Sequence, residues 1–246
     1  MSHSHACCTI PPVASNYQAT GTMEKAGAEE LPVYVVGPKD AKKAILVIYD
    51  IFGLHNNTKQ FCDILANKCG YKVVMPDFFR GDYWTPEKMG DMQALLAWIG
   101  KVGSIEVIAP QIKSVAEWLQ GQGVTKAGLV GFCWGAKIAV QITEIDNAFF
   151  GGASLVHPSF VDVKDAEKAG APILALPSKD EPDMTEYMKV LSQKPFGDKC
   201  AHHRFDDVPH GFAAARGDYT DELHKKRATE AIQLTANFFS KVLSDN

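Results

Sequence analysis

The feature that most constrains the fold is a repeated alternation of short apolar runs with amphipathic, helix-like segments. The runs are rich in β-branched residues, which is typical of strands that are buried on both faces of a sheet. They lie at residues 42–53, 71–79, 124–132, 151–158, 171–178 and 202–208. The helix-like segments cover residues 57–70, 85–102, a stretch opened by Pro110, 136–143, 186–193 and 221–243. This order predicts an α/β fold, a mostly parallel sheet with helices on both faces.

Length and composition favour one globular domain. The chain has 246 residues, of which 46% are hydrophobic and 22% charged. These values suit a single large α/β domain with a substantial core. We expect residues 1–20 to form a flexible N-terminal segment, and residues 21–246 to form the domain. A sheet protein of this size can exist as a monomer, and we expect one.

The sequence gives no indication of a nucleic-acid or membrane partner. The formal net charge of −4 gives no reason to expect nucleic acid. No apolar run approaches the roughly 20 residues of a transmembrane helix, and residues 1–18 lack the pattern of a secretory signal. We therefore expect a cytoplasmic protein with no membrane partner.

The six cysteines do not form a recognisable metal site. They do not form paired CxxC motifs, so a structural zinc site is not expected. His3, His5, Cys7 and Cys8 are close together near the N-terminus, but we interpret them as part of a flexible tail. We predict neither a bound metal nor a cofactor.

Residues 129–136, Leu-Val-Gly-Phe-Cys-Trp-Gly-Ala, place a cysteine at the junction of an expected strand and helix. The pattern G-x-C-x-G has the form of a nucleophile elbow, with Gly131 and Gly135 avoiding collisions around the tight turn. Cys133 would be the nucleophile, and the helix N-terminus would favour its thiolate. The backbone N–H of Trp134 would donate to an oxyanion. Taken alone the motif is weak, and a buried inert cysteine is the alternative.

The other members of a catalytic triad follow in the order nucleophile, acid, histidine. Asp180 comes just after the expected strand 171–178, and Asp183, three residues later, is an alternative acid. His210 lies in a Pro/Gly loop before the C-terminal helix. His210 would accept the thiol proton and return it to the leaving alcohol. Asp180 would hold the imidazole in one tautomer and stabilise the imidazolium.

With these pieces in place, the chain resembles the dienelactone hydrolase family, thiol hydrolases with the α/β-hydrolase fold. The matching stretches are IYDIFGLHNNTKQ, PDFFRGD, GLVGFCWGAK, ILALPSKDEPD and VPHGFAAARGD, in the order of the family. The resemblance implies cofactor-independent hydrolysis of a small ester or lactone. It assigns Cys133 as nucleophile, Asp180 as acid and His210 as base.

The resemblance also suggests residues around the triad. Asp50 matches a glutamate that helps to activate the thiol in bacterial members, and the backbone N–H of Ile51 would complete the oxyanion hole. Arg80 matches an arginine that binds the substrate carboxylate, through the paired hydrogen bonds a guanidinium can donate. A second such arginine is replaced here by Ala214, with Arg216 two residues further on. This departure puts dienelactone itself in doubt as substrate.

Three hypotheses about function follow. The first is a thiol esterase or lactonase that acts on a small substrate through an acyl-cysteine intermediate. The second is a carboxylesterase with a broader, more apolar substrate range, which Ala214 favours slightly. The third is a non-catalytic small-molecule-binding protein with a redox-sensitive Cys133. The complete set of triad residues argues against the third.

Overall fold

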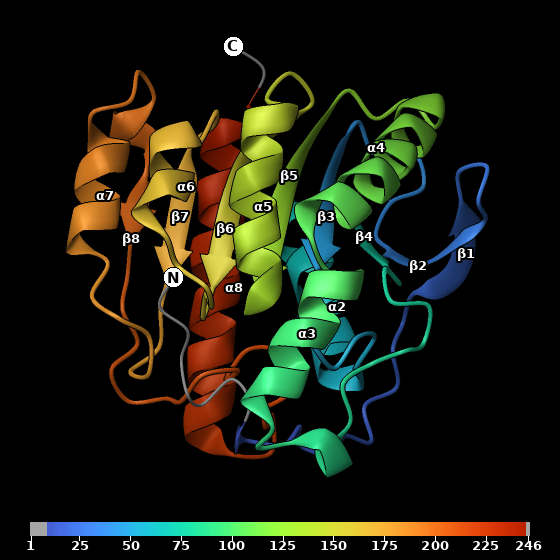
Figure 1. Ribbon diagram of the computed structural model, residues 1–246. Helices are drawn as coiled ribbons and strands as arrows, with labels where there is room; N and C mark the ends of the chain where they lie inside the picture. Colours follow the sequence, from blue (N-terminus) through green and yellow to red (C-terminus); the bar gives the residue numbers. More distant parts are fainter. Residues whose placement is uncertain (1–8, 245–246) are drawn as a thin grey trace.

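The apolar runs form a single sheet of eight strands in the order β1-β2-β4-β3-β5-β6-β7-β8 (Figure 1). The computed structural model describes residues 9–244. The strands are β1 Thr22–Ala26, β2 Leu31–Val36, β3 Lys43–Ile48, β4 Lys72–Pro76, β5 Lys126–Phe132, β6 Phe150–Val156, β7 Ile173–Leu176 and β8 Ala201–His202. The strands from β4 to β8 in this order are parallel, whereas β2 pairs antiparallel with both β1 and β4. The predicted mostly parallel sheet is confirmed.

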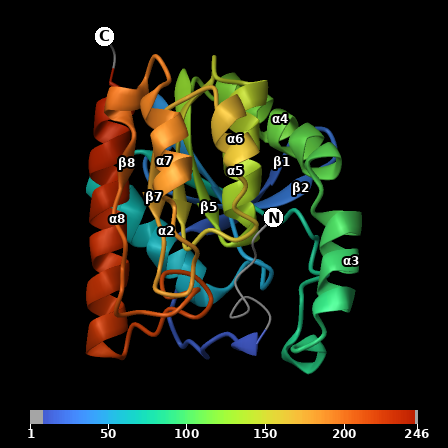
Figure 2. The same cartoon turned by 60° about the vertical axis from the view of Figure 1, so that its left-hand side comes forward.

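Helices cover both faces of the sheet. The α-helices are α2 Asn56–Cys69, α3 Met92–Val102, α4 Ile105–Gly121, α5 Trp134–Ile145, α6 Val163–Lys168, α7 Thr185–Ser192 and α8 Glu222–Val242, with short 3-10 turns η1 Pro86–Lys88 and η2 Gly197–Lys199. Figure 2 shows α8 and α2 on one face, with α4, α5 and α6 on the other. Gly70 ends α2 as expected, since its positive φ of 66° lets its N–H reach the carbonyl of Ala66.

The strand register brings several loops to one edge of the sheet. Ile48 at the end of β3 pairs with Gly131 of β5, and Phe132 pairs with Val156 at the end of β6. Val156 in turn pairs with Leu176 at the end of β7. Because parallel strands end at the same edge, the segments that follow β3, β5, β6 and β7 are neighbours.

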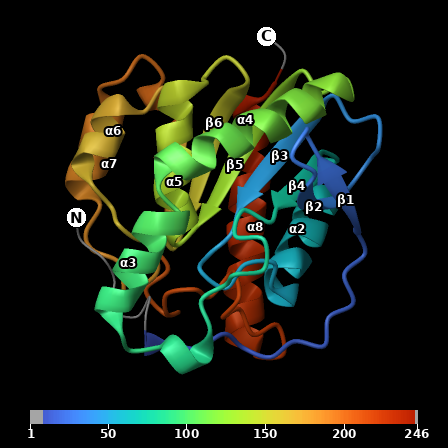
Figure 3. The same ribbon diagram turned by 45° about the vertical axis from the view of Figure 1, so that its right-hand side comes forward.

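Some elements differ from the expectation. The hairpin of β1 and β2, which forms one edge of the sheet (Figure 3), was not predicted. Most of β1 is solvent-exposed, so its sequence lacks an apolar run. Helix α4 begins at Ile105, not at Pro110, which lies inside it. Glu106 in its first turn suits the positive helix N-terminus.

The N-terminal segment contacts the domain. Val13 N–H donates to the carbonyl of Ala215 at 3.0 Å, and the Tyr17 hydroxyl donates to the Asp63 carboxylate at 2.8 Å. Thr20 donates to the same carboxylate through its backbone N–H, also at 2.8 Å. Residues 9–20 therefore make specific contacts with the domain, and the flexible segment stays a prediction. Residues 1–8, with His3, His5, Cys7 and Cys8, lie outside the described residues.

No single helix within residues 9–244 is long and apolar enough to cross a membrane. The bent pair α3 and α4, which meet at 47°, passes the same test of length and composition only when taken together.

Candidate active site

Cys133 occupies a strained turn between β5 and α5. Its φ of 55° and ψ of −118° lie in a region that non-glycine residues avoid, at a cost of about 1–3 kcal/mol. A Cβ on Gly131 would lie 2.3 Å from the carbonyl oxygen of Gly135, and one on Gly135 would lie 2.3 Å from that of Ile48. Both glycines are therefore required by backbone contacts, and the strand–turn–helix form of a nucleophile elbow is present.

His210 is held by an acid from the β7–α7 loop. Its Nδ1 lies 2.7 Å from Oε1 of Glu181, and both side chains are completely buried. The second carboxylate oxygen of Glu181 accepts a short hydrogen bond from the backbone N–H of Ser178. The Glu181 carboxylate is thus fixed between the end of β7 and the imidazole. This geometry holds the imidazole in one orientation.

The predicted contact between Asp180 and the imidazole is not found. The Asp180 carboxylate instead accepts from the backbone N–H of His210 at 2.8 Å. Its neighbour Glu181 reaches the ring because consecutive loop residues point in different directions. Asp183, the alternative acid, is exposed and accepts from the N–H and hydroxyl of Thr185 at the start of α7. The sequence contained a signal for Glu181, an acid next to the predicted one, but no local pattern separates the two.

The segment after β6 contacts both Cys133 and His210. The backbone N–H of Cys133 donates to Val156 at 3.2 Å, and that of Ser159 donates to the carbonyl of Cys133 at 3.0 Å. The sulfur of Cys133 lies 3.5 Å from Oγ of Ser159. The ring of His157 lies edge-on to that of His210, with centroids 5.0 Å apart. Residues 156–159 therefore contact both Cys133 and His210.

His157 is a site residue that the sequence analysis missed. It is completely buried, and neither ring nitrogen has a hydrogen-bond partner among the described residues. Burial lowers the pKa of His157 well below its usual value, and the charges of His210 and Arg216 lower it further. Burial without a hydrogen-bond partner therefore favours the neutral form of the ring. Its only sequence signal was its place directly after a buried strand.

Asp50 lies in the turn after β3 and is also completely buried. Its carboxylate accepts from the backbone N–H of Phe52 at 2.9 Å and from that of Ala215 at 3.3 Å. Burial raises the pKa of Asp50, while Arg216 and these two donors oppose the rise. Asp50 thus ties the turn after β3 to the loop that carries His210.

The two predicted oxyanion donors lie at the ends of β3 and β5. Trp134 is the first residue of α5, where a backbone N–H has no acceptor within its own helix. Its indole N–H donates to the carbonyl of Gly103 at 2.9 Å. Ile51 follows Asp50, and its carbonyl accepts from the N–H of Trp84 at 3.0 Å. These contacts hold both residues at the carboxyl edge of the sheet.

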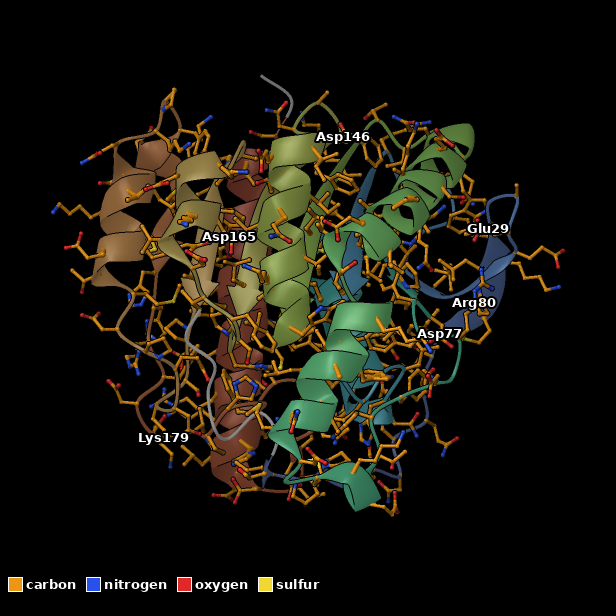
Figure 4. All side chains as sticks on the ribbon, viewed as in Figure 1. Glu29, Asp77, Arg80, Asp146, Asp165 and Lys179 are labelled. Atoms are coloured by element: carbon orange, nitrogen blue, oxygen red, sulfur yellow. The ribbon has the colours of Figure 1, made fainter. Side chains whose placement is uncertain are left out.

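Arg80 is placed elsewhere. Its guanidinium pairs with Glu29 at 3.3 Å, and its side chain is 46% exposed. Figure 4 shows Arg80 and Glu29 together beside β1, at the outer edge of the sheet. The predicted substrate-binding role of Arg80 is not supported by this placement, because its charge is turned toward the β1–β2 turn.

Arg216 lies near the site instead. It is 2% exposed, and its guanidinium carbon lies 4.9 Å from the centroid of the Phe52 ring. Its Nε donates a short hydrogen bond to the carbonyl of Ile10. The N-terminal segment and Asn57, which donates to Val13 and Ala215, therefore pack against the loop that follows His210.

Within the described residues, no group of three or more His, Cys, Asp or Glu side chains is arranged to hold a metal ion.

Residues 31–243 match the dienelactone hydrolase family. The chain belongs to this family. An uncharacterized AIM2 family protein of Schizosaccharomyces pombe is 33% identical over 223 residues, which cover 87% of this chain and 88% of that protein.

Other similarities point the same way. The protein of Gibberella moniliformis named dienlactone hydrolase 1 is 28% identical over 209 residues, which cover 80% of this chain and 78% of that protein. The crystal structure of dienelactone hydrolase from Anabaena variabilis shares the fold, with a TM-score of 0.66 and 14% identity over 92% of this chain and 98% of that one. This member of the dienelactone hydrolase family is therefore an ester hydrolase with the α/β-hydrolase fold.

Proposed function

We propose that this protein hydrolyses a small ester or lactone through Cys133, His210 and Glu181, with an acyl-cysteine intermediate and no cofactor. The observation that carries the proposal is the buried contact of 2.7 Å between Glu181 and Nδ1 of His210, and Cys133 in a strained elbow supplies the candidate nucleophile. A carboxylate on Nδ1 leaves Nε2 as the nitrogen that exchanges protons with the nucleophile.

Acylation would begin with proton transfer from the thiol of Cys133 to His210. The thiolate then attacks the ester carbonyl carbon, and the negative charge that develops on the carbonyl oxygen is stabilised by the backbone N–H groups of Trp134 and Ile51. The carbon–oxygen bond of the ester breaks, and His210 returns the proton to the leaving alcohol. A thioester on Cys133 remains.

Deacylation repeats these steps with water. His210 takes a proton from the water as its oxygen attacks the thioester carbonyl, and the same two N–H groups stabilise the oxyanion. The carbon–sulfur bond breaks, His210 returns the proton to the sulfur of Cys133, and the acid is released. Glu181 stabilises the imidazolium in both halves of the reaction.

The placement of the arginines favours a neutral ester over a lactone that carries a carboxylate. Arg80 pairs with Glu29 at the sheet edge, and position 214 is alanine. Arg216 is already engaged by the carbonyl of Ile10 and the ring of Phe52. We therefore place a carboxylesterase activity ahead of dienelactone hydrolysis, in a monomeric, cytoplasmic enzyme.

The test is hydrolysis of p-nitrophenyl acetate, p-nitrophenyl butyrate and a dienelactone by the wild-type protein and by Cys133→Ala. We expect turnover of the p-nitrophenyl esters by wild type and its loss in Cys133→Ala. Preference for the dienelactone would assign a carboxylate-binding lactonase instead. Turnover that survives in Cys133→Ala would contradict the proposed nucleophile. Absence of turnover together with saturable ligand binding, measured by thermal shift, would favour the non-catalytic alternative.

A further inference from the structure

The segment after β6 supplies a hydroxyl group to the nucleophile. Oγ of Ser159 lies 3.5 Å from the sulfur of Cys133, within the range of a hydrogen bond to sulfur. Both residues are buried, with Ser159 2% exposed and Cys133 completely enclosed. In this geometry the thiol donates and the hydroxyl accepts.

The contact is fixed by the backbone around it. Cys133 N–H donates to Val156, and Ser159 N–H donates back to the carbonyl of Cys133. The two hydrogen bonds tie residues 156–159 to the elbow, so the backbone of Ser159 is held next to Cys133. From this backbone position the hydroxyl of Ser159 reaches the sulfur.

The acid at the matching place in the turn after β3 is occupied with other donors. Asp50 accepts from the backbone N–H groups of Phe52 and Ala215. These contacts direct its carboxylate toward the loop after His210. The resemblance to bacterial relatives assigns thiol activation to this position, but here a hydroxyl from another strand end contacts the sulfur.

We infer that Ser159 stabilises the reactive thiolate of Cys133. A hydroxyl can accept from a thiol and, after rotation about its C–O bond, donate to a thiolate. When the thiol proton moves to His210, Ser159 neither gains nor loses a proton, and its own O–H turns to the sulfur. A hydrogen bond to the charged form of a group favours that form. Ser159 therefore lowers the free energy needed to ionise the Cys133 thiol.

This inference rests on the proposed role of Cys133 as nucleophile, but its test requires no substrate. The thiolate absorbs near 240 nm, and a pH titration of this absorbance gives the midpoint of thiol ionisation. The contribution of Cys133 is isolated by subtracting the titration of Cys133→Ser, or of the matching double variant for each change at position 159. Hydrolysis is measured separately.

We expect Ser159→Ala to raise the Cys133 midpoint by about one pH unit, because a hydrogen bond to a charged group is lost. Ser159→Thr keeps a hydroxyl and should hold the midpoint near that of wild type. Ser159→Val has the shape of threonine without the hydroxyl, and it should match Ser159→Ala. If Ser159→Ala does not fold, the difference in the Cys133 midpoint between Ser159→Thr and Ser159→Val tests the inference.

Midpoints that agree between Ser159→Thr and Ser159→Val, and between wild type and Ser159→Ala, would overturn the inference. A shifted midpoint in a protein that hydrolyses no ester would uphold the contact with Ser159 and reject the proposed function. Normal hydrolysis with an unshifted midpoint would support the proposed function and overturn the inference about Ser159. The two failures are therefore distinguishable.

Discussion

At the scale of single residues, two adjacent acids bind different parts of His210. Glu181 contacts the imidazole at 2.7 Å, whereas Asp180 accepts from the backbone N–H of the same residue at 2.8 Å. The first contact bears on the protonation of the ring, and the second on the shape of the loop. Substitutions that remove each charge while retaining size should separate the two.

We expect Glu181→Gln to lower kcat by about a hundredfold or more, because a neutral amide does not stabilise the imidazolium and can select the wrong tautomer. Asp180→Asn keeps an oxygen that can accept from the N–H of His210, so we expect a loss of tenfold or less. Steady-state kinetics of both variants on the best ester checks this. The reverse ranking would restore Asp180 as the catalytic acid.

His157 predicts a pH dependence of stability. Its pKa is lowered by burial in the folded protein, so below about pH 6.5, the usual value for histidine, the unfolded chain binds a proton that the folded chain does not. The contribution of His157 to the free energy of unfolding is therefore fully present above that pH. It falls as the pH decreases, by up to about 1.4 kcal/mol per pH unit.

Replacing the ring with phenylalanine should remove this dependence. We expect the free energy of unfolding of His157→Phe, measured with urea between pH 7 and pH 5, to fall less steeply than that of wild type. The comparison cancels the contributions of other titrating groups, which both proteins share. Parallel curves would show that His157 is protonated in the folded state.

At the scale of elements, the elbow depends on the close approach of α5 to β3. A Cβ on Gly135 would lie 2.3 Å from the carbonyl oxygen of Ile48 and 2.7 Å from that of Tyr49. Neither atom is the end of a flexible side chain, so the helix or the strand must shift. The constraint belongs to the junction between the elements, and not to the cysteine alone.

We expect Gly135→Ala to destabilise the protein by at least about 3 kcal/mol, the upper end of the usual cost of overpacking. Gly121 at the end of α4 is the matched control, since a Cβ there would meet nothing within 4 Å. Gly121→Ala should be neutral or stabilising by about 0.5–1 kcal/mol. Thermal and urea unfolding of both variants checks the contrast, and equal effects would contradict it.

At the scale of the whole molecule, few large hydrophobic side chains are exposed on the described residues. The exposed large hydrophobic residues lie singly on different elements, and they are Met23, Leu96, Val107, Ile145, Val163 and Leu223. Scattered apolar side chains of this kind are ordinary for a monomer. The proposed catalytic groups Cys133, Glu181 and His210 also come from a single chain.

We therefore expect the protein to sediment as a species of 26.9 kDa across micromolar concentrations in analytical ultracentrifugation. Activity per molecule should stay constant on dilution over the same range. A dimer whose dissociation abolishes activity would show that an interface contributes to the site.

The strands from β3 to β7, most of the helices, the elbow at Cys133 and the loop of His210 could be predicted from the sequence, because each rests on a local pattern. Buried strands require apolar runs, and the tight turn requires glycines at Gly131 and Gly135. The edge strand β1 was missed because its exposed residues carry no such pattern.

Contacts between distant segments were decided only by the tertiary structure. Glu181 and Asp180 are equivalent acids in the sequence, and the direction of each side chain depends on how the β7–α7 loop meets His210. Ser159 reaches the sulfur because β6 pairs with β5 in one register. Arg80 turns to Glu29 because an unpredicted hairpin supplies the partner. Local sequence patterns determine which residues form buried strands and tight turns, whereas tertiary packing determines which distant residues contact one another.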